Sequence, residues 1–234
     1  MSEELLSYYN NGQIESKHSY TNDECVKHEV WYENGNKLKE ANYKNNLFDG
    51  LYKEWYFEGQ LRIKCMFING ECIKCEEWYE NGNKLKEANY KKRLPHSLYQ
   101  EWYNNGQLKI KRMFINGERI KHEKWYENGN KFKEVNYKER LPHGLYKEWY
   151  NNGQLKFKCS FINKKFNGLY ESFFENGNRF QEINYKEGIF HGLYQEWYTN
   201  GQLKIKCYYI NGKLNGLYES FYKNGDKETE CNYS

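Results

Sequence analysis

A turn dipeptide that recurs at a nearly constant interval is the feature that most restricts how this chain can fold. Asn-Gly, or a close relative of it, places a glycine every 23 or 24 residues along the 234-residue chain. The ten glycines are Gly12, Gly35, Gly59, Gly82, Gly106, Gly129, Gly153, Gly177, Gly201 and Gly225. A fixed period of this length is typical of repeat architectures, in which each unit packs only on its neighbours.

Each of these turns joins two short runs that suit β-strands. Asn-Gly between alternating apolar and polar residues is the strongest short-range signal for a β-hairpin, because both residues tolerate a positive φ. A second group of turn residues after each hairpin folds the chain back again. We therefore predict an all-β fold, an elongated, twisted antiparallel β-meander of tandem hairpin repeats in a solenoid-like array.

The period covers nearly the whole chain, so we predict a single array over residues 1–234. Residues 1–30 form a degenerate N-terminal copy, and residues 31–234 hold the regular repeats. Copies that begin Trp-Tyr-Glu-Asn-Gly alternate with copies that contain Leu-Tyr-x-Glu-Trp-Tyr. The full period is therefore a pair of hairpins.

The hairpin around Gly106 illustrates the expected strand register. A three-residue loop at 104–106 would pair Trp102 with Leu108 and Glu101 with Lys109, which gives good cross-strand partners. One face would then carry Leu98, Trp102, Leu108, Ile110 and Phe114, and the other Tyr99, Glu101, Tyr103, Lys109 and Lys111.

The alternate copies carry one more residue between the turn glycine and the next apolar residue. A four-residue loop at 80–83 would restore the same kind of register there. It would pair Trp78 with Leu85 and Glu77 with Lys86.

Composition excludes several classes of protein. Aromatic residues make up 19% of the chain, which argues against disorder. The net charge of +4 comes from 36 basic and 32 acidic residues, a mixed surface that argues against nucleic-acid binding. No apolar run approaches the ~20 residues of a membrane span, and the start lacks the features of a secretory signal. Seven cysteines without such a signal indicate reduced thiols, so we expect an intracellular, cytoplasmic protein.

The repeat pattern resembles the MORN repeat in its shorter variant form, over about residues 8–233. The residues that carry the resemblance include Tyr146, Trp149, Tyr150, Asn152, Gly153, Leu155, Phe161, Asn163, Asn167, Gly168 and Tyr170. The pattern departs from the family at Ser97 and Lys164, which replace turn glycines. The resemblance implies a twisted hairpin array without a catalytic centre, with roles in protein contact, scaffolding, dimerisation, lipid binding or, as in some bacterial relatives, antitoxin activity.

The cysteines are expected to pack in the core. Cys65, Cys159 and Cys207 occupy equivalent positions on an apolar face, too far apart along the array for a disulfide. Cys72 and Cys75 form the one C-x-x-C motif, and with Cys65 they could bring three thiolates together. A structural zinc site usually needs four ligands, so we predict no metal and no cofactor.

No catalytic constellation is apparent in the sequence. It holds no nucleophile elbow, no phosphate-binding loop and no converging pair of carboxylates. We therefore expect a protein that is not an enzyme.

The candidate binding surface is a face rich in tyrosine and lysine, because tyrosine rings offer contact area at a low entropic cost. The alternative is that these rings only cover the second face of a single-layer sheet. The candidate residues are Tyr52, Tyr56, Tyr99, Tyr103, Tyr146, Tyr150, Tyr194, Tyr198, Lys109, Lys111, Lys156 and Lys158.

We predict a non-enzymatic scaffold that binds a protein partner through this surface. Two alternatives stay open, an antitoxin-like inhibitor of a protein partner and a module that binds anionic membrane surfaces. Open terminal strands also favour a homodimer formed edge to edge.

Overall fold

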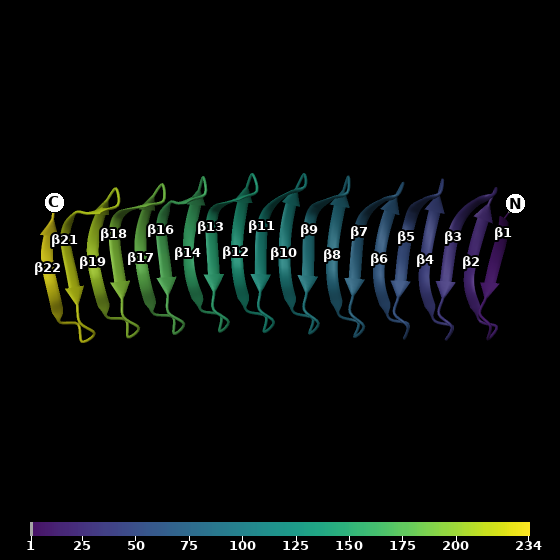
Figure 1. Ribbon diagram of the computed structural model, residues 1–234, viewed down its shortest axis with the longest axis horizontal. Coiled ribbons are helices and arrows are strands. Elements are labelled where there is room, and N and C mark those ends of the chain that lie inside the picture. The colour runs from purple at the N-terminus through teal and green to yellow at the C-terminus, as the bar shows by residue number, and fades with distance from the viewer. Residues whose placement is uncertain (1) are drawn as a thin grey trace. The chain divides into compact units, whose positions relative to one another are not determined.

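The computed structural model describes residues 2–234, and every regular element in that range is a β-strand (Figure 1). The all-β prediction is confirmed. The chain divides into two compact units, residues 1–118 and 119–234. The prediction of a single array over residues 1–234 stays a prediction.

The first unit is an antiparallel meander in which each strand pairs with the next in the chain. Its strands are β1 (Ser2–Tyr8), β2 (Ile14–Thr21), β3 (Glu24–Trp31), β4 (Lys37–Lys44), β5 (Leu47–Trp55), β6 (Leu61–Ile68), β7 (Glu71–Trp78), β8 (Lys84–Lys91), β9 (Leu94–Trp102) and β10 (Leu108–Ile115).

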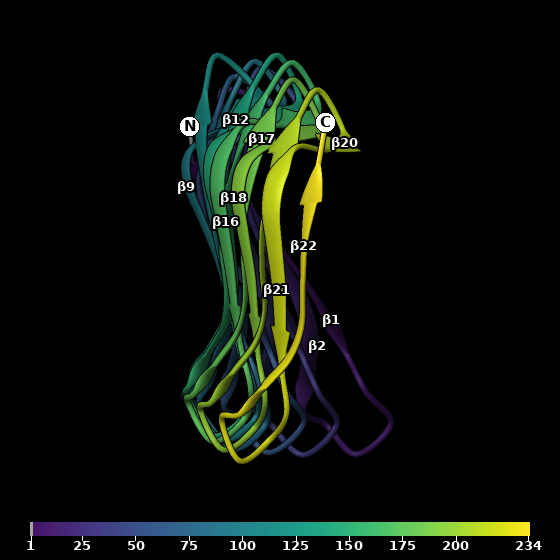
Figure 2. The same cartoon turned by 90° about the vertical axis from the view of Figure 1, so that its left-hand side faces the viewer.

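The second unit repeats this meander, with two short strands added before β16 and β21. Its strands are β11 (Glu118–Trp125), β12 (Lys131–Lys138), β13 (Leu141–Trp149), β14 (Leu155–Ile162), β15 (Lys165–Phe166), β16 (Gly168–Phe173), β17 (Arg179–Lys186), β18 (Ile189–Trp197), β19 (Leu203–Ile210), β20 (Lys213–Leu214), β21 (Gly216–Phe221) and β22 (Lys227–Tyr233). The strands of this unit are bowed along their length (Figure 2).

Every Asn-Gly turn has the same closed loop. In one type of copy, the Tyr103 amide donates to the Gln107 carbonyl at 2.8 Å and the Gly106 amide donates to the Tyr103 carbonyl at 2.9 Å. In the other type, Tyr79 and Asn83 make the equivalent bond at 2.9 Å. Both types therefore have a three-residue loop, and the predicted four-residue loop at 80–83 is wrong.

A bulge directly after each loop changes the register that we predicted. Trp102 does lie opposite Leu108, but Glu101 lies opposite Ile110, and Lys109 is the extra residue. The predicted pairing of Glu101 with Lys109 is therefore wrong, and Ile110 and Phe114 lie on the face opposite to Trp102. A shift of one residue moves every later side chain to the other face.

The same bulge occurs in the alternate copies. Glu77 lies opposite Lys86 as predicted, but Trp78 lies opposite Lys84, so its predicted pairing with Leu85 is wrong. The bulge residue in this hairpin is Leu85 itself.

Copies of 24 residues have one more residue than copies of 23. This additional residue lies in a second bulge, near the start of a strand. Gly50 of β5, Gly144 of β13 and Gly192 of β18 hold this position with φ of 96°, 69° and 111°. In β9 the same position is Ser97, with φ of 63°. This conformation is left-handed, which costs a residue with a side chain about 1–2 kcal/mol.

Replacing Ser97 with glycine is therefore expected to stabilise the first unit. We expect a gain of about 1 kcal/mol, because the relief of strain exceeds the extra freedom that glycine has in the unfolded chain. Urea unfolding followed by circular dichroism would measure it. The reciprocal control is Gly144→Ser, where a Cβ would meet nothing within 4 Å. It should lower the unfolding free energy by a similar amount. An unchanged urea midpoint in both variants would contradict this explanation.

The two faces of each sheet differ in composition. The core face carries the buried apolar residues, all at most 8% exposed: Ala41, Cys65, Ala88, Ile110, Val135, Cys159, Ile183 and Cys207. Tyrosines lie directly opposite several of them, as in the pairs Ala88–Tyr99 and Val135–Tyr146. In the second unit, contacts between Tyr and Phe rings run from strand to strand along this face.

The charged face lies on the opposite side. In the second unit, neighbouring strands place two glutamates and then two lysines opposite one another, in the order Glu123, Glu134, Lys147, Lys158, Glu171, Glu182. The same order of charges begins in the first unit at Glu29, Glu40, Lys53 and Lys64. We refer to this row as the charge ladder.

Candidate interaction surface

Each pair of glutamates in the charge ladder is closed by basic side chains. The Lys131 ammonium lies 2.8 Å from the Glu123 carboxylate and 3.0 Å from that of Glu134. Lys121 reaches the same two carboxylates at 3.5 and 2.8 Å. Glu123 is only 8% exposed, so these ion pairs offset the cost of burying its charge.

The eighth and tenth copies, which also carry glutamate pairs, replace one of these lysines with leucine. Leu169 and Leu217 lie opposite Asn184 and Asn232, just as Lys121 lies opposite Asn136. The two leucines are 41% and 44% exposed. The substitution therefore turns part of the charged face into apolar surface.

These leucines belong to a row of apolar side chains on the charged face, which we call the apolar stripe. Its members in the second unit are Leu145, Leu169, Leu193, Tyr208 and Leu217. Leu193 lies opposite Tyr208, and Leu145 and Tyr208 are 38% and 44% exposed. Leu193, Tyr208 and Leu217 line a shallow hollow together with Lys206 and Glu219 of the charge ladder.

The first unit has a shorter version of this stripe. Leu51 lies opposite Met66, and Leu98 lies opposite Met113. The two methionines are 36% and 41% exposed. Our reading of the sequence missed these residues, although the leucine that opens each Leu-Tyr-x-Glu-Trp copy marks the stripe.

Four of the predicted tyrosines lie on the core face. They are half-buried, and each hydroxyl donates to a glutamate two residues further along the strand: Tyr52 to Glu54, Tyr99 to Glu101, Tyr146 to Glu148 and Tyr194 to Glu196. Burial and the bond to Glu101 raise the pKa of Tyr99 to about 12. These phenols therefore stay neutral and support the core.

The other four tyrosines, Tyr56, Tyr103, Tyr150 and Tyr198, begin the hairpin loops. Tyr56 donates to the Trp78 carbonyl of the next hairpin at 2.8 Å, and Tyr150 donates to that of Phe173 at 3.0 Å. Tyr198 bonds the Phe221 carbonyl in the same way at 3.0 Å. We call this contact the tyrosine clamp, since it joins a loop to the following one; the loop that begins with Phe174 lacks the hydroxyl for it.

The predicted lysines are also divided between two places. Lys109 and Lys156 lie over the rings of Tyr103 and Tyr150 at the loops, 5.3 and 5.6 Å from the ring centroids. Lys111 and Lys158 lie on the charged face, where Lys158 pairs with Glu171 at 2.5 Å. The predicted grouping on one face is therefore wrong, because the bulge after each loop separates the set. Whether these residues bind a partner stays a prediction.

The cysteines also differ from expectation. Cys65 and Cys75 form a disulfide, so the prediction that all seven cysteines are reduced thiols is wrong for this pair. The remaining cysteines are free, and Cys159 and Cys207 are buried on the core face as predicted. The disulfide removes one argument for an intracellular location, which stays a prediction.

The ten hairpins correspond one to one with matches to a known family. The family is described as the MORN repeat variant, and each match spans the two strands of one hairpin. The matched residues are 4–22, 25–45, 48–69, 72–92, 95–116, 120–139, 142–163, 166–187, 190–211 and 214–234. The chain belongs to the MORN repeat variant family. The resemblance noted in the sequence is confirmed, and each MORN repeat in this chain is one hairpin closed by a three-residue loop.

Other comparisons add little to the MORN assignment. A chain in the structure titled "Crystal Structure of TcdB2-TccC3-Cdc42" shares 11% identity over 99% of this chain and 17% of its own length, with a TM-score of 0.25. A likeness this weak carries no argument. A search of curated proteins finds no match. Among residues 2–234, no helix is long and apolar enough to cross a membrane.

The charge ladder should make the stability of this MORN array sensitive to acid. A hydrogen bond from Lys84 lowers the pKa of Glu87 below its ordinary 4.5. Burial opposes this shift, and a second bond from Lys74 adds to it. The pKa of Glu134 is lowered as well, because bonds from Lys121 and Lys131 outweigh burial. A lowered folded-state pKa adds stability above pH 4.5 that is lost as the pH falls through the lower value. Urea midpoints measured from pH 7 to pH 2.5 should therefore fall below about pH 4.5.

Removing one lysine that pairs with glutamates of the ladder tests this cause. Lys84→Met should lower stability at pH 7 by roughly 1 kcal/mol, and it should flatten the acid limb because the pKa of Glu87 returns toward its ordinary value. Lys91→Met, at the exposed end of the same strand, is the control and should keep the wild-type acid limb. An acid limb that is unchanged in Lys84→Met would contradict the assignment.

Proposed function

We propose that this MORN repeat protein is a non-catalytic scaffold that binds a protein partner along the charged face. The apolar stripe is the observation that carries the proposal. It exposes Leu145, Leu169, Tyr208 and Leu217 on the charged face, each two residues along its strand from a charged member of the ladder. Exposed apolar side chains that are rimmed by polar groups favour a contact with another protein.

The charges around the stripe favour protein over other partners. Pairs of glutamates alternate with pairs of lysines, in two of which Gln100 or Gln195 replaces one lysine. Most of the glutamates make ion pairs with basic side chains. A surface of this kind has little net field, whereas nucleic acid and anionic lipid require a positive one. A protein with complementary charges can match the pairs, and they would set its register on the array.

The tyrosine and lysine residues predicted from the sequence define a second candidate contact at the loops. Lys109 and Lys156 lie on loop tyrosines there, beside exposed Asn-Gly turns. An antitoxin role would be a special case of the same proposal, with one tight partner. A homodimer through terminal strands is a separate possibility that the tests below distinguish by mass.

The test compares the tagged full-length protein with two variants, and with a further loop variant that carries Lys109→Ser and Lys156→Ser. Each is used in an affinity purification from its native cells that is read by quantitative mass spectrometry. The stripe variant carries Leu169→Ser, Tyr208→Ser and Leu217→Ser. The matched control carries Tyr222→Ser, an exposed ring in a hairpin loop, 52% exposed and outside the stripe. Circular dichroism establishes that both variants keep the fold.

We expect one protein to co-purify in stoichiometric amount with the wild type and the control, and to be absent from the stripe variant. The same protein, once purified, should bind the wild type directly. A partner that is lost instead with Lys109→Ser and Lys156→Ser would move the site to the loops. Binding to anionic vesicles without a protein partner would overturn the proposal in favour of a membrane-surface role. A stable mass of two chains with no other partner would overturn it in favour of self-association.

A further inference from the structure

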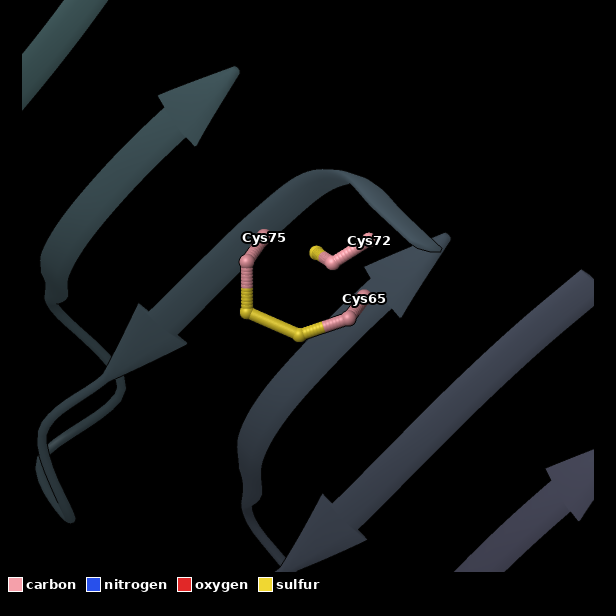
Figure 3. A group of neighbouring side chains, drawn as sticks. All are labelled: Cys65, Cys72 and Cys75. Carbon is pink, nitrogen blue, oxygen red and sulfur yellow. A yellow bond between two sulfur atoms is a disulfide. The ribbon is translucent and has the colours of Figure 1, made fainter. Parts of the chain in front are cut away.

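Three cysteine sulfurs meet on the core face of the first unit. Cys65 of β6 lies directly opposite Cys75 of β7, with their Cα atoms 4.1 Å apart, and the two form a disulfide. The sulfur of Cys72 points toward them from the start of β7, and all three sulfur atoms lie within 4.8 Å of one another (Figure 3). Among residues 2–234, this is the one group of three His, Cys, Asp or Glu side chains whose ligand atoms come so close.

A bulge in β7 makes this grouping possible. Residues three apart in a regular strand point to opposite faces. Phe67 lies opposite Cys72 and Met66 lies opposite Lys74, so Ile73 is an extra residue between them. The bulge brings Cys72 to the same face as Cys75.

The fold brings two of these three positions together in other copies too. The equivalent residues of the first pair of hairpins are His18, Cys25 and His28, and the two imidazole rings stack with centroids 4.0 Å apart. In the second unit, Arg119 and His122 hold two of the positions, with Nη1 and Nδ1 3.3 Å apart. The proximity is therefore a property of the repeat, and the first unit fills one instance of it with three cysteines.

The surroundings of the cluster are partly apolar and positively charged. Phe67, Tyr90 and Arg93 line an open hollow with the three cysteines. Cys65 is 6% exposed. The positive charge of Lys86 acts on the Cys72 sulfur, and Lys86 also pairs with the Glu77 carboxylate at 2.9 Å.

We propose that the reduced cluster is a binding site for one Cu(I) ion, held by Cys65, Cys72 and Cys75 in three-coordinate geometry. Thiolates select soft ions such as Cu(I) and Zn(II). Metal–sulfur bonds of about 2.3 Å in a trigonal plane set the sulfurs about 4 Å apart, a separation that the cluster reaches once the disulfide opens. Lys86 and Arg93 offset the charge of −2 that three thiolates and Cu(I) carry together.

Among residues 2–234, no fourth His, Cys, Asp or Glu joins the three cysteines, which favours Cu(I) over Zn(II). A structural zinc ion takes four ligands in a tetrahedron, and the Glu77 carboxylate is already held by Lys86. An ion that accepts three thiolates does not need the second C-x-x-C motif that a zinc site usually has.

Binding and disulfide formation exclude each other. A dithiol reductant supplies two electrons and two protons, so the Cys65–Cys75 bond breaks to two thiols while the dithiol closes to its own disulfide. Binding of Cu(I) to the three thiols then releases three protons, one from each sulfur. Because binding releases protons, it should tighten as the pH rises.

The experiment uses full-length protein, reduced with a phosphine and handled without oxygen. Cu(I) is titrated in competition with a chromophoric chelator, and bound copper is followed by near-ultraviolet thiolate-to-copper absorption. We expect one Cu(I) per chain at this site, and loss of that equivalent in Cys72→Ser and in Cys75→Ser. Cys25→Ser, at the position equivalent to Cys72 in the first pair of hairpins, is the matched control and should keep it.

Three results would overturn the proposal. One is an equal copper content in wild type and in a Cys72→Ser protein whose circular dichroism is unchanged. Another is loss of the ion in Cys25→Ser but not in Cys72→Ser, which would place it elsewhere. The third comes from the same titration with Zn(II): a zinc complex that resists the competing chelator and requires Cys72 would reject the three-coordinate Cu(I) assignment. Oxidised protein, with the Cys65–Cys75 bond intact, should bind no copper at this site.

Discussion

Val135→Asp is expected to lower the unfolding free energy of the second unit by about 4 kcal/mol. Val135 is 1% exposed and lies between His122 and Tyr146 on neighbouring strands of the core face. A carboxylate there would lose its hydration between these two rings, and burying a charge with incomplete compensation typically costs several kcal/mol. In a repeat array each hairpin packs only on its neighbours, so we expect the damage to concentrate on β11 to β13.

Hydrogen exchange read by mass spectrometry, together with urea unfolding, would measure both the size and the place of this effect. Ile162→Asp is the control, because Ile162 belongs to the same unit and is 46% exposed. It should change stability by no more than about 0.5 kcal/mol. Equal losses in the two variants would show that the core face does not carry the stability of the unit.

Gly192→Val is the second substitution with a large expected effect, about 3 kcal/mol. Gly192 has a φ of 111°, which a β-branched residue does not adopt without strain. A Cβ at this position would also lie 3.1 Å from the Asn184 Cβ. Asn184 holds the bulge by donating to the Leu193 carbonyl at 3.1 Å, so the clash would break that bond as well.

Gly168→Val separates the two causes. Gly168 has a φ of 84°, but a Cβ there would meet nothing within 4 Å. This variant should lose only the part of the unfolding free energy that comes from the left-handed backbone conformation, about 1–2 kcal/mol. Thermal unfolding of both proteins gives the comparison, and a loss in Gly168→Val as large as in Gly192→Val would rule out the contact with Asn184 as a cause.

The repeat and its hairpins could be predicted from the sequence because their signals are local. Asn-Gly turns have few alternatives, and ten of them in phase determine the order of the strands. The register could not be predicted, because Lys109 and Leu85 have no feature that marks them as bulge residues. Each bulge reverses the faces of everything that follows, so Ile110 was placed on the wrong side.

The candidate site was affected by the same error. Tyr99 and Lys111 were expected to share a face, and the bulge puts them on opposite ones. The hydrogen bonds of the tyrosines could not be read from the sequence either, since Tyr56 reaches a backbone carbonyl 22 residues away. The disulfide was missed because Cys65 was compared with its equivalents in other copies, whereas its partner, Cys75, lies on the adjacent strand.

The tyrosine clamp has a consequence for how proteins of this kind change length. Each clamp joins a loop to the next one through the same acceptor position, as Tyr32 does with Trp55 at 2.9 Å and Tyr126 does with Trp149 at 2.9 Å. Duplication of a gene segment that encodes one hairpin would therefore supply both halves of a new clamp. The charge ladder, however, repeats only every two hairpins. Insertion of a single hairpin would therefore set two glutamate pairs, or two lysine pairs, side by side. Such an array tolerates the duplication of two consecutive hairpins together, so its length should vary in steps of about 47 residues.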